Sequence, residues 1–175
     1  MKCKQLDVYS KYKIRLNDQG KIIYADDDFM KFTGFDIDDL IGEDFSVLFA
    51  PEFVEGEYAQ MLFPLLKENP KMYFIINGRM KDGDCYWAVV RSTHYTSPGS
   101  DKVKFLWEMK MIPETVIPAL DELFGKLIEI RNSAGQKYAM KYFQGYMEDK
   151  GIDLKNFAFS MLDTKEKKLD KYFQI

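Results

Sequence analysis

Residues 72–112 read MYFIINGRMKDGDCYWAVVRSTHYTSPGSDKVKFLWEMKMI and carry the clearest fold signal in the chain. Three parts of this stretch are rich in aromatic and β-branched residues, which favour strands: 72–80, 85–95 and 102–112. Asp82-Gly83 separates the first two parts and favours a tight hairpin with positive φ. Pro98-Gly99, within a run of small polar residues, separates the second and third parts. The stretch therefore predicts a three-stranded antiparallel meander.

The third of these segments alternates between apolar and charged residues. One face takes Val103, Phe105, Trp107, Met109 and Met111; the other takes Lys102, Lys104, Glu108 and Lys110. This pattern predicts a strand with one covered face and one mostly wet face. In the first segment, Asn77-Gly78 is a competing turn signal. We interpret it as a bulge or close-approach glycine inside the strand, because Asp82-Gly83 separates two better strands.

Upstream, Tyr12–Leu16 and Lys21–Ala25 are short strand-like segments around a polar turn, and they predict a second hairpin. Acidic residues before Phe29 and Leu40 predict two short helices, because carboxylates stabilise helix starts. Residues 52–68 predict a longer helix, with apolar side chains at helical spacing and a stop at Asn69-Pro70.

Downstream of Pro113 the apolar spacing is helical. Residues 116–132 and 138–150 predict two helices, and Asp153 can cap a third, short one. Residues 163–175 show no convincing periodicity, so we expect them to fray or to form a helix only when packed.

The composition excludes several classes of protein. A net charge of −3 argues against nucleic-acid binding through a general basic field. Cys3 and Cys85 are too few for a disulfide framework, and acidic Asp84 predicts an unreactive thiol at Cys85 without redox function. His94 is the single histidine, which excludes sites that need two. No apolar run approaches the ~18 residues of a membrane helix, so we expect a cytoplasmic protein without a membrane span.

The order of these elements, with two motifs, resembles the PAS domain family. The first motif is Gly20-Lys21-Ile22-Ile23-Tyr24-Ala25-Asp26, followed by Phe29, Thr33-Gly34-Phe35 and Leu40-Ile41-Gly42. The second is Lys81-Asp82-Gly83-Asp84-Cys85-Tyr86-Trp87, which is similar to a hairpin in PAS domains related to the bacterial aerotaxis receptor. The resemblance implies an α+β PAS fold, with a five-stranded antiparallel sheet, short helices on one side and C-terminal helices after the last strand.

We divide the chain accordingly into four parts: an N-terminal extension 1–11, a PAS sensory domain 12–112, a C-terminal helical appendage 113–162 and a tail 163–175. The resemblance implies a bacterial, chemotaxis-related sensor and not an enzyme. In the first hypothesis, a small ligand binds in the pocket and the C-terminal helices relay the change to a signalling partner protein. In the alternative, the domain binds no ligand and serves as a dimerisation or protein-interaction module. We expect a homodimer.

The candidate ligand-binding residues are aromatic side chains of the pocket or core and one polar pair. They are Tyr24, Phe29, Phe45, Tyr58, Phe74, Asn77, Arg79 and Trp107. If the strand is regular, Asn77 and Arg79 share the sheet face of Tyr73 and Ile75, where a polar pair can orient a ligand.

The identity of any cofactor stays open. PAS domains of the aerotaxis type carry FAD, but only Arg79 and Tyr86-Trp87 match the flavin motif here, and its other residues are absent. Heme is not expected, because the related heme domains ligate from the helical side, which holds no histidine in this chain. The acidic residues miss the spacing of a calcium loop, and no nucleophile accompanies them, so neither a metal site nor catalysis is expected.

Overall fold

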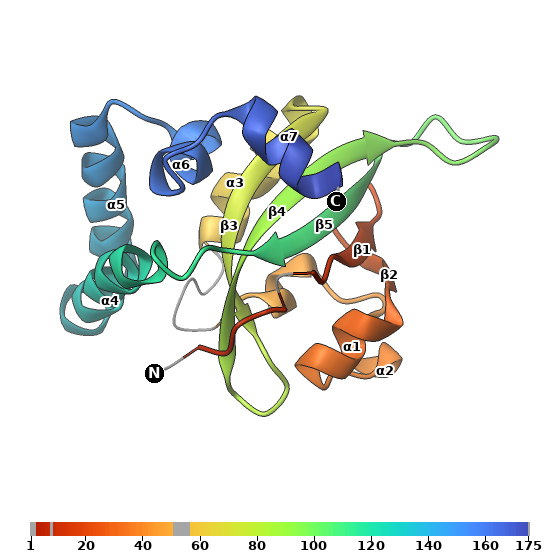
Figure 1. The fold of residues 1–175 in the computed structure, drawn as a ribbon, viewed down its shortest axis with the longest axis horizontal. Helices are drawn as coiled ribbons and strands as arrows, with labels where there is room; N and C mark the ends of the chain where they lie inside the picture. The colour runs from red at the N-terminus through yellow and green to blue at the C-terminus, as the bar shows by residue number, and fades with distance from the viewer. Residues whose placement is uncertain (1–2, 8, 51–56, 175) are drawn as a thin grey trace.

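A computed structural model describes residues 3–7, 9–50 and 57–174 of the chain. Five strands form one antiparallel sheet (Figure 1): β1 Tyr12–Leu16, β2 Ile22–Ala25, β3 Lys71–Arg79, β4 Cys85–Tyr95 and β5 Lys104–Met111. Their order across the sheet is β2-β1-β5-β4-β3. Gly83 in the β3–β4 hairpin has a φ of 93°, which an Asp-Gly turn uses. The predicted α+β fold and its two hairpins are confirmed.

The strand register assigns each side chain to one of two sheet faces. Ser92 of β4 lies opposite Trp107 of β5, on the side that we call the inner face. Their neighbours Arg91 and Glu108 also lie opposite each other, on the outer face. Successive side chains of a strand point to opposite faces, so every later statement about the site depends on this register.

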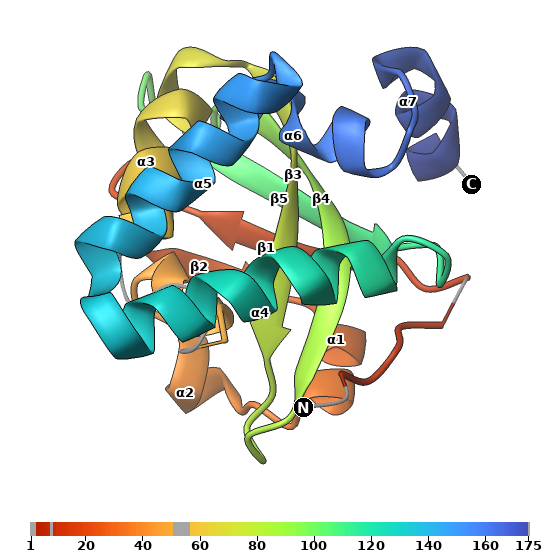
Figure 2. The same ribbon diagram turned by 90° about the vertical axis from the view of Figure 1, so that its left-hand side faces the viewer.

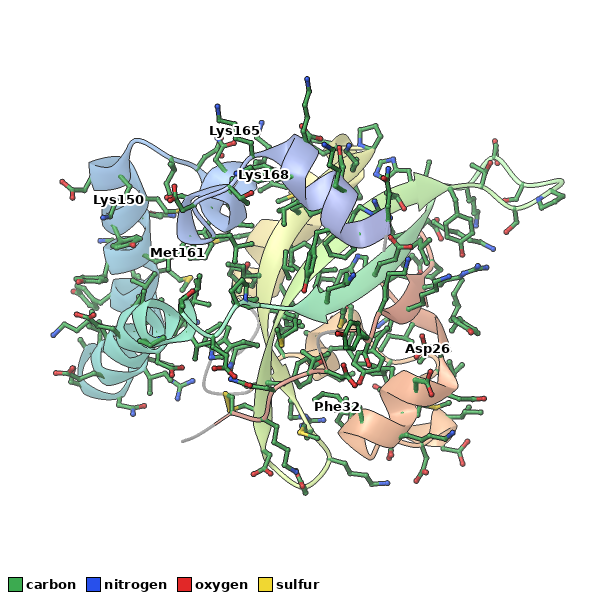
Figure 3. All side chains as sticks on the ribbon, in the orientation of Figure 1. Asp26, Phe32, Lys150, Met161, Lys165 and Lys168 are labelled. Carbon is green, nitrogen blue, oxygen red and sulfur yellow. A yellow bond between two sulfur atoms is a disulfide. The ribbon has the colours of Figure 1, made fainter. Side chains whose placement is uncertain are left out.

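Three helices and one 3-10 helix cover the inner face: α1 Asp27–Thr33, α2 Ile37–Leu40, η1 Phe45–Leu48 and α3 Glu57–Glu68. The predicted acidic helix starts are caps, because the Asp26 carboxylate accepts a hydrogen bond from the Phe29 N–H at 2.8 Å. Figure 3 shows Asp26 where the chain leaves β2 and enters α1. Of the predicted helix over 52–68, α3 is the part from Glu57 onward, and residues 51–56 lie outside the described residues.

Four further helices lie on the outer side of the sheet: α4 Ile117–Ala134, α5 Gln136–Lys150, which packs on α4, α6 Leu154–Met161 and α7 Glu166–Gln174. The α4 helix docks through Phe124, whose ring centroid lies 5.3 Å from that of Trp87 on β4. Figure 2 shows α4 and α5 as a helical pair crossing this side of the sheet. The three predicted C-terminal helices are therefore present.

The prediction that β5 has one mostly wet face is wrong. Glu108 and Lys110 point outward but are only 7% and 2% exposed, because α7 packs over them (Figure 1). Residues 163–175, which showed no convincing periodicity, contain the nine-residue α7 with Leu169 and Phe173 buried. Leu169, Tyr172 and Phe173 share one face of this helix, but so short a helix is marginal in water, and packing on the sheet stabilises it.

The two cysteines, predicted as separate thiols, are joined by a disulfide with a Cα–Cα distance of 4.5 Å. They are 82 residues apart in the chain, so sequence spacing could not indicate the pairing. A bridge between Lys4 and Tyr86 brings them together. Among the described residues, no helix is both long and apolar enough to cross a membrane.

Gly78 is the close-approach glycine that the sequence predicted inside β3. The ring of Tyr86, its partner on β4, lies over the Gly78 backbone. A Cβ atom at position 78 would sit 2.0 Å from the Tyr86 Cζ atom, far inside van der Waals contact. Tyr86 is fully buried, so its ring has little room to move.

We predict that Gly78→Ala lowers the free energy of unfolding by about 2–3 kcal/mol, because overpacking forces the ring or the strand to shift. The matched control is Gly145→Ala on the exposed face of α5, where a new Cβ meets nothing within 4 Å. The free energy of unfolding of that control should rise by up to about 1 kcal/mol, because alanine favours a helix more than glycine does. Urea denaturation measures both values, and equal stabilities of the two variants would contradict the close approach.

Candidate functional site

Five of the eight predicted ligand-binding residues lie together on the inner side of the sheet. They are Phe29, Phe45, Tyr58, Phe74 and Trp107, each at most 3% exposed. Trp107 is at the centre of this cluster, with the ring centroid of Phe74 at 5.0 Å and that of Phe45 at 5.4 Å. Both pairs are edge-to-face, which is a favourable arrangement of aromatic rings. The inner face is therefore an aromatic-lined interior.

Two polar atoms in this interior have no hydrogen-bond partner among the residues that the structure describes. Trp107 is 0% exposed and Ser92 is 1% exposed, yet the indole Nε1 and the hydroxyl Oγ are both unsatisfied. The two residues are direct cross-strand neighbours on the inner face. A buried polar group without a partner costs about 1–3 kcal/mol, so two adjacent ones require an explanation.

The sequence analysis identified Trp107 but missed Ser92. A single serine in a strand carries no signal of its own, and only the register of β4 against β5 places it beside the indole. The available indication was that Ser92 shares the alternation of the buried apolar residues Ala88 and Val90.

The other three predicted residues lie elsewhere. Tyr24 is 45% exposed on β2, with the Arg15 guanidinium 5.5 Å from its ring centroid. Asn77 and Arg79 share the strand face of Tyr73 and Ile75, as the alternation predicted, but this is the outer face. They are thus separated by the sheet from Phe74 and Trp107, and their contact with a ligand stays a prediction.

The residues considered for heme and for a flavin make other contacts or lie on opposite faces of the sheet. The imidazole Nε2 of His94 donates a hydrogen bond to the Leu66 carbonyl oxygen, at 2.6 Å, which engages this nitrogen. Of the flavin-motif pair, Tyr86 is on the inner face but Trp87 is on the outer face, where its indole donates to the Asp121 carboxylate at 3.0 Å. Among the described residues, no group of three His, Cys, Asp or Glu side chains could hold a metal ion.

An ion pair lies on the outer face of the sheet, next to Ser92 and Trp107 along the two strands. Arg91 Nε donates to Glu108 Oε2 at 2.9 Å, and a second guanidinium nitrogen contacts the same oxygen. The Lys11 ammonium adds a longer contact of 3.9 Å to Glu108. Glu108 is only 7% exposed, so its charge needs these partners.

This ion pair is part of the surface on which α7 docks. The Arg91 guanidinium lies 5.1 Å from the ring centroid of Phe173, and Lys11 donates to the Phe173 carbonyl oxygen at 3.2 Å. Lys110, 2% exposed, donates to the Tyr172 carbonyl oxygen at 2.7 Å. Burial lowers the pKa of Lys110, and the charge of Lys11 lowers it further. Three cations thus bind the last turn of α7, where helix carbonyl oxygens lack partners within the helix.

Asp170 is the second anchor of α7. Its carboxylate accepts a hydrogen bond from the Tyr73 hydroxyl at 2.5 Å and one from the Lys71 ammonium at 3.0 Å. The Tyr73 hydrogen bond, with Lys71 nearby, holds the pKa of Asp170 below its usual value near 3.8. Burial raises the pKa of Tyr73, so its hydroxyl stays protonated as the donor. Docking of α7 therefore depends on an ionised carboxylate.

The comparisons with known proteins concern the fold of the sheet and its inner helices. The profile of the family described as PAS domain matches residues 12–109. No curated protein matches the chain. Among solved structures, the PAS domain of an HTR-like protein from Haloarcula marismortui has a TM-score of 0.52 at 16% identity, covering 59% of this chain and 83% of that one. The blue-light photoreceptor Aureochrome1 LOV has a TM-score of 0.52 at 16% identity, covering 63% and 88%. At such identities the likeness concerns the fold alone.

We predict that Asp170→Asn lowers the free energy of unfolding at pH 7 by about 1 kcal/mol, the scale of a hydrogen bond to a charged group at a partly exposed site. Because the folded-state pKa of Asp170 is depressed, its stabilisation is present above the unfolded-state pKa and is lost as the pH falls through the folded value. The difference between variant and wild type should therefore shrink as the pH falls below the unfolded-state pKa of about 3.9 and vanish below the folded-state value.

Urea denaturation at pH 7 and pH 3 checks this prediction. The control is Asp163→Asn, because Asp163 is exposed just after α6 and its φ of 46° suits asparagine. An Asp170→Asn defect that is the same at both pH values would rule out the charged anchor.

Proposed function

Because the chain belongs to the PAS domain family, we propose that it is a sensory module that binds a small ligand between the sheet and helices α1–α3. We propose further that the presence of the ligand is relayed through the sheet to the C-terminal helices and from them to a signalling partner. PAS domains are typically sensory and not catalytic, and we assign no reaction to this chain. A bacterial source, a cytoplasmic location and a link to chemotaxis stay predictions from the sequence.

The observation that carries the proposal is the buried polar pair of Ser92 and Trp107. The indole N–H can only donate a hydrogen bond, whereas the serine hydroxyl can donate or accept. A ligand with an acceptor atom near both would satisfy them, while its apolar part would contact Phe74, Phe45 and their aromatic neighbours. This combination of apolar walls with a few convergent polar groups is typical of small-molecule sites.

The register of β4 and β5 supports the proposed relay. Arg91 precedes Ser92 on β4, and Glu108 follows Trp107 on β5. Because these neighbours point to opposite faces, a ligand that displaces the inner pair also displaces the outer ion pair on which α7 rests. The ligand changes the helix position only if it binds the docked and undocked forms with different affinity.

We predict that natively purified protein releases a small molecule on denaturation and that Ser92→Ala retains several-fold less of it. In the bound protein the hydroxyl has a partner, so its loss weakens binding, whereas an unliganded core would gain from losing an orphan hydroxyl. Mass spectrometry of the released fraction and thermal melting measure the two effects.

The control for that experiment is Thr33→Val. The Thr33 hydroxyl is also buried but donates to the Phe29 carbonyl oxygen at 2.8 Å, so its loss should lower stability by about 1 kcal/mol without affecting ligand retention. Wild-type protein that releases nothing, together with a Ser92→Ala variant more stable than wild type, would reject the ligand hypothesis.

That outcome would favour the alternative, a ligand-free interaction or dimerisation module. The observation supporting this alternative is the exposed surface of α5, where Tyr138 and Tyr142 are 57% and 44% exposed. Tyr142 also lines a hollow of about 700 Å³ between α4 and α5. Tyrosine is enriched at protein interfaces, because its ring is apolar and its hydroxyl tolerates water.

If α5 forms the dimer interface, the double variant Tyr138→Ser/Tyr142→Ser should raise the dimer dissociation constant by about tenfold or more, since interface tyrosines often contribute over 1 kcal/mol each. Sedimentation equilibrium of the full chain measures the constant. Tyr9→Ser, which removes an 87% exposed tyrosine far from α5 in the sequence, is the matched control. Identical constants for all three proteins would exclude α5 as the interface.

A further inference from the structure

The disulfide between Cys3 and Cys85 lies outside the proposed ligand site and has no part in the relay described above. It ties residues 3–7 to the first residue of β4. Cys85 is only 4% exposed, whereas Cys3 is partly exposed. One sulfur of the bond is therefore more accessible to a reagent in solution than the other.

Contacts other than the bond hold the two cysteines in register. The Lys4 N–H donates to the Cys85 carbonyl oxygen at 2.7 Å, and Lys4 pairs with Tyr86 as an isolated parallel bridge. The Lys4 ammonium lies 2.9 Å from the Asp84 carboxylate and 3.3 Å from that of Asp82. Leu6, at 2% exposure, anchors the same segment in the core. After cleavage of the bond these contacts would keep the two thiols within reach of each other.

The bond also lies next to the place where α4 docks. The Asn77 amide donates to Cys3 Sγ at 3.3 Å, and Asn77 is the cross-strand partner of Trp87. Trp87 in turn donates to Asp121 and packs on Phe124, both on α4. A change at Cys3 is thus separated from α4 by only two residues.

We propose that Cys3 and Cys85 form a redox modification site, at which small thiols of the glutathione class open and close the disulfide while the domain stays folded. The thiolate of the small molecule attacks Cys3 Sγ, the bond to Cys85 breaks, and Cys85 leaves as a thiolate that takes up a proton. The thiolate of a second small molecule then attacks the sulfur of the small molecule that is bound to Cys3. This releases the Cys3 thiolate, which takes up a proton, and the disulfide of the two small molecules. The protein gains two electrons and two protons, and oxidised glutathione reverses both steps.

The first test is a redox titration of the full chain, without denaturant, across buffers of different reduced-to-oxidised glutathione ratio. Acid quenching, alkylation with iodoacetamide and intact-mass measurement give the fraction of protein with zero or two free thiols. We expect one transition between these species, with the same midpoint when approached from the reduced and from the oxidised side.

Two outcomes would overturn the proposal. Thiols that stay free, or that carry only glutathione adducts in excess oxidised glutathione, would show that the internal bond does not form. If the disulfide opens only after urea is added, it stabilises the folded domain and is not a modification site. The variant Cys3→Ser distinguishes an internal disulfide from a glutathione adduct, because Cys85 alone can form only a mixed disulfide with glutathione.

The second test is hydrogen exchange of the oxidised protein, the reduced protein and the Cys3→Ser/Cys85→Ser variant. The Lys4 amide and the amides of α4 should exchange several-fold faster in the latter two, while those of α1 should be unchanged. Equal exchange in all three proteins would reject a coupling between the bond and α4. Because the readouts are thiol counts and exchange rates, failure of this proposal is distinguishable from failure of the ligand hypothesis.

Discussion

The register of β4 against β5 is the constraint on which the rest of the structure depends. It places Ser92 and Trp107 side by side in an aromatic interior and, one residue along each strand, places Arg91 and Glu108 side by side beneath α7. A shift by one residue would place Arg91 opposite Trp107 and Val90 opposite Glu108, which would split the ion pair and leave a buried charge unpaired, a strongly unfavourable change. The polar interior and the charged helix-docking surface are therefore two consequences of one pairing.

Helices cover both faces of the sheet, so some charged residues on its strands are buried and bind neighbouring groups instead of facing solvent. Lysine and glutamate at alternate positions of an antiparallel strand normally face water, but here Lys110 binds α7 directly and Glu108 pairs with Arg91, which packs on Phe173 of α7. Part of the docking of α7 is electrostatic, through Lys71, Asp170 and Lys110, so it responds to charge as well as to apolar burial. That property suits the relay proposed for this chain.

Local chemistry explains which predictions from the sequence succeeded. The Asp82-Gly83 turn, the cap formed by Asp26 and the glycine within β3 each depend on residues close in sequence or on one cross-strand neighbour, and each is present. Five predicted aromatic residues meet in the interior for the same reason, because alternation along strands and helical spacing determine which side chains point inward. The wet face assigned to β5 was wrong because α7 covers it, and of the two alternatives for 163–175 the structure has the helix that forms on packing.

By itself the sequence determined the five strands, most of the helices, the order of the hairpins and the family, since these follow from periodicity, turn chemistry and motifs of a few residues. Only the tertiary structure decided that Ser92 lies beside Trp107, that Asn77 lies behind the sheet and that Cys3 meets Cys85. These facts depend on the register between segments up to 82 residues apart. Such pairings are set by the burial of whole faces, which no single segment encodes.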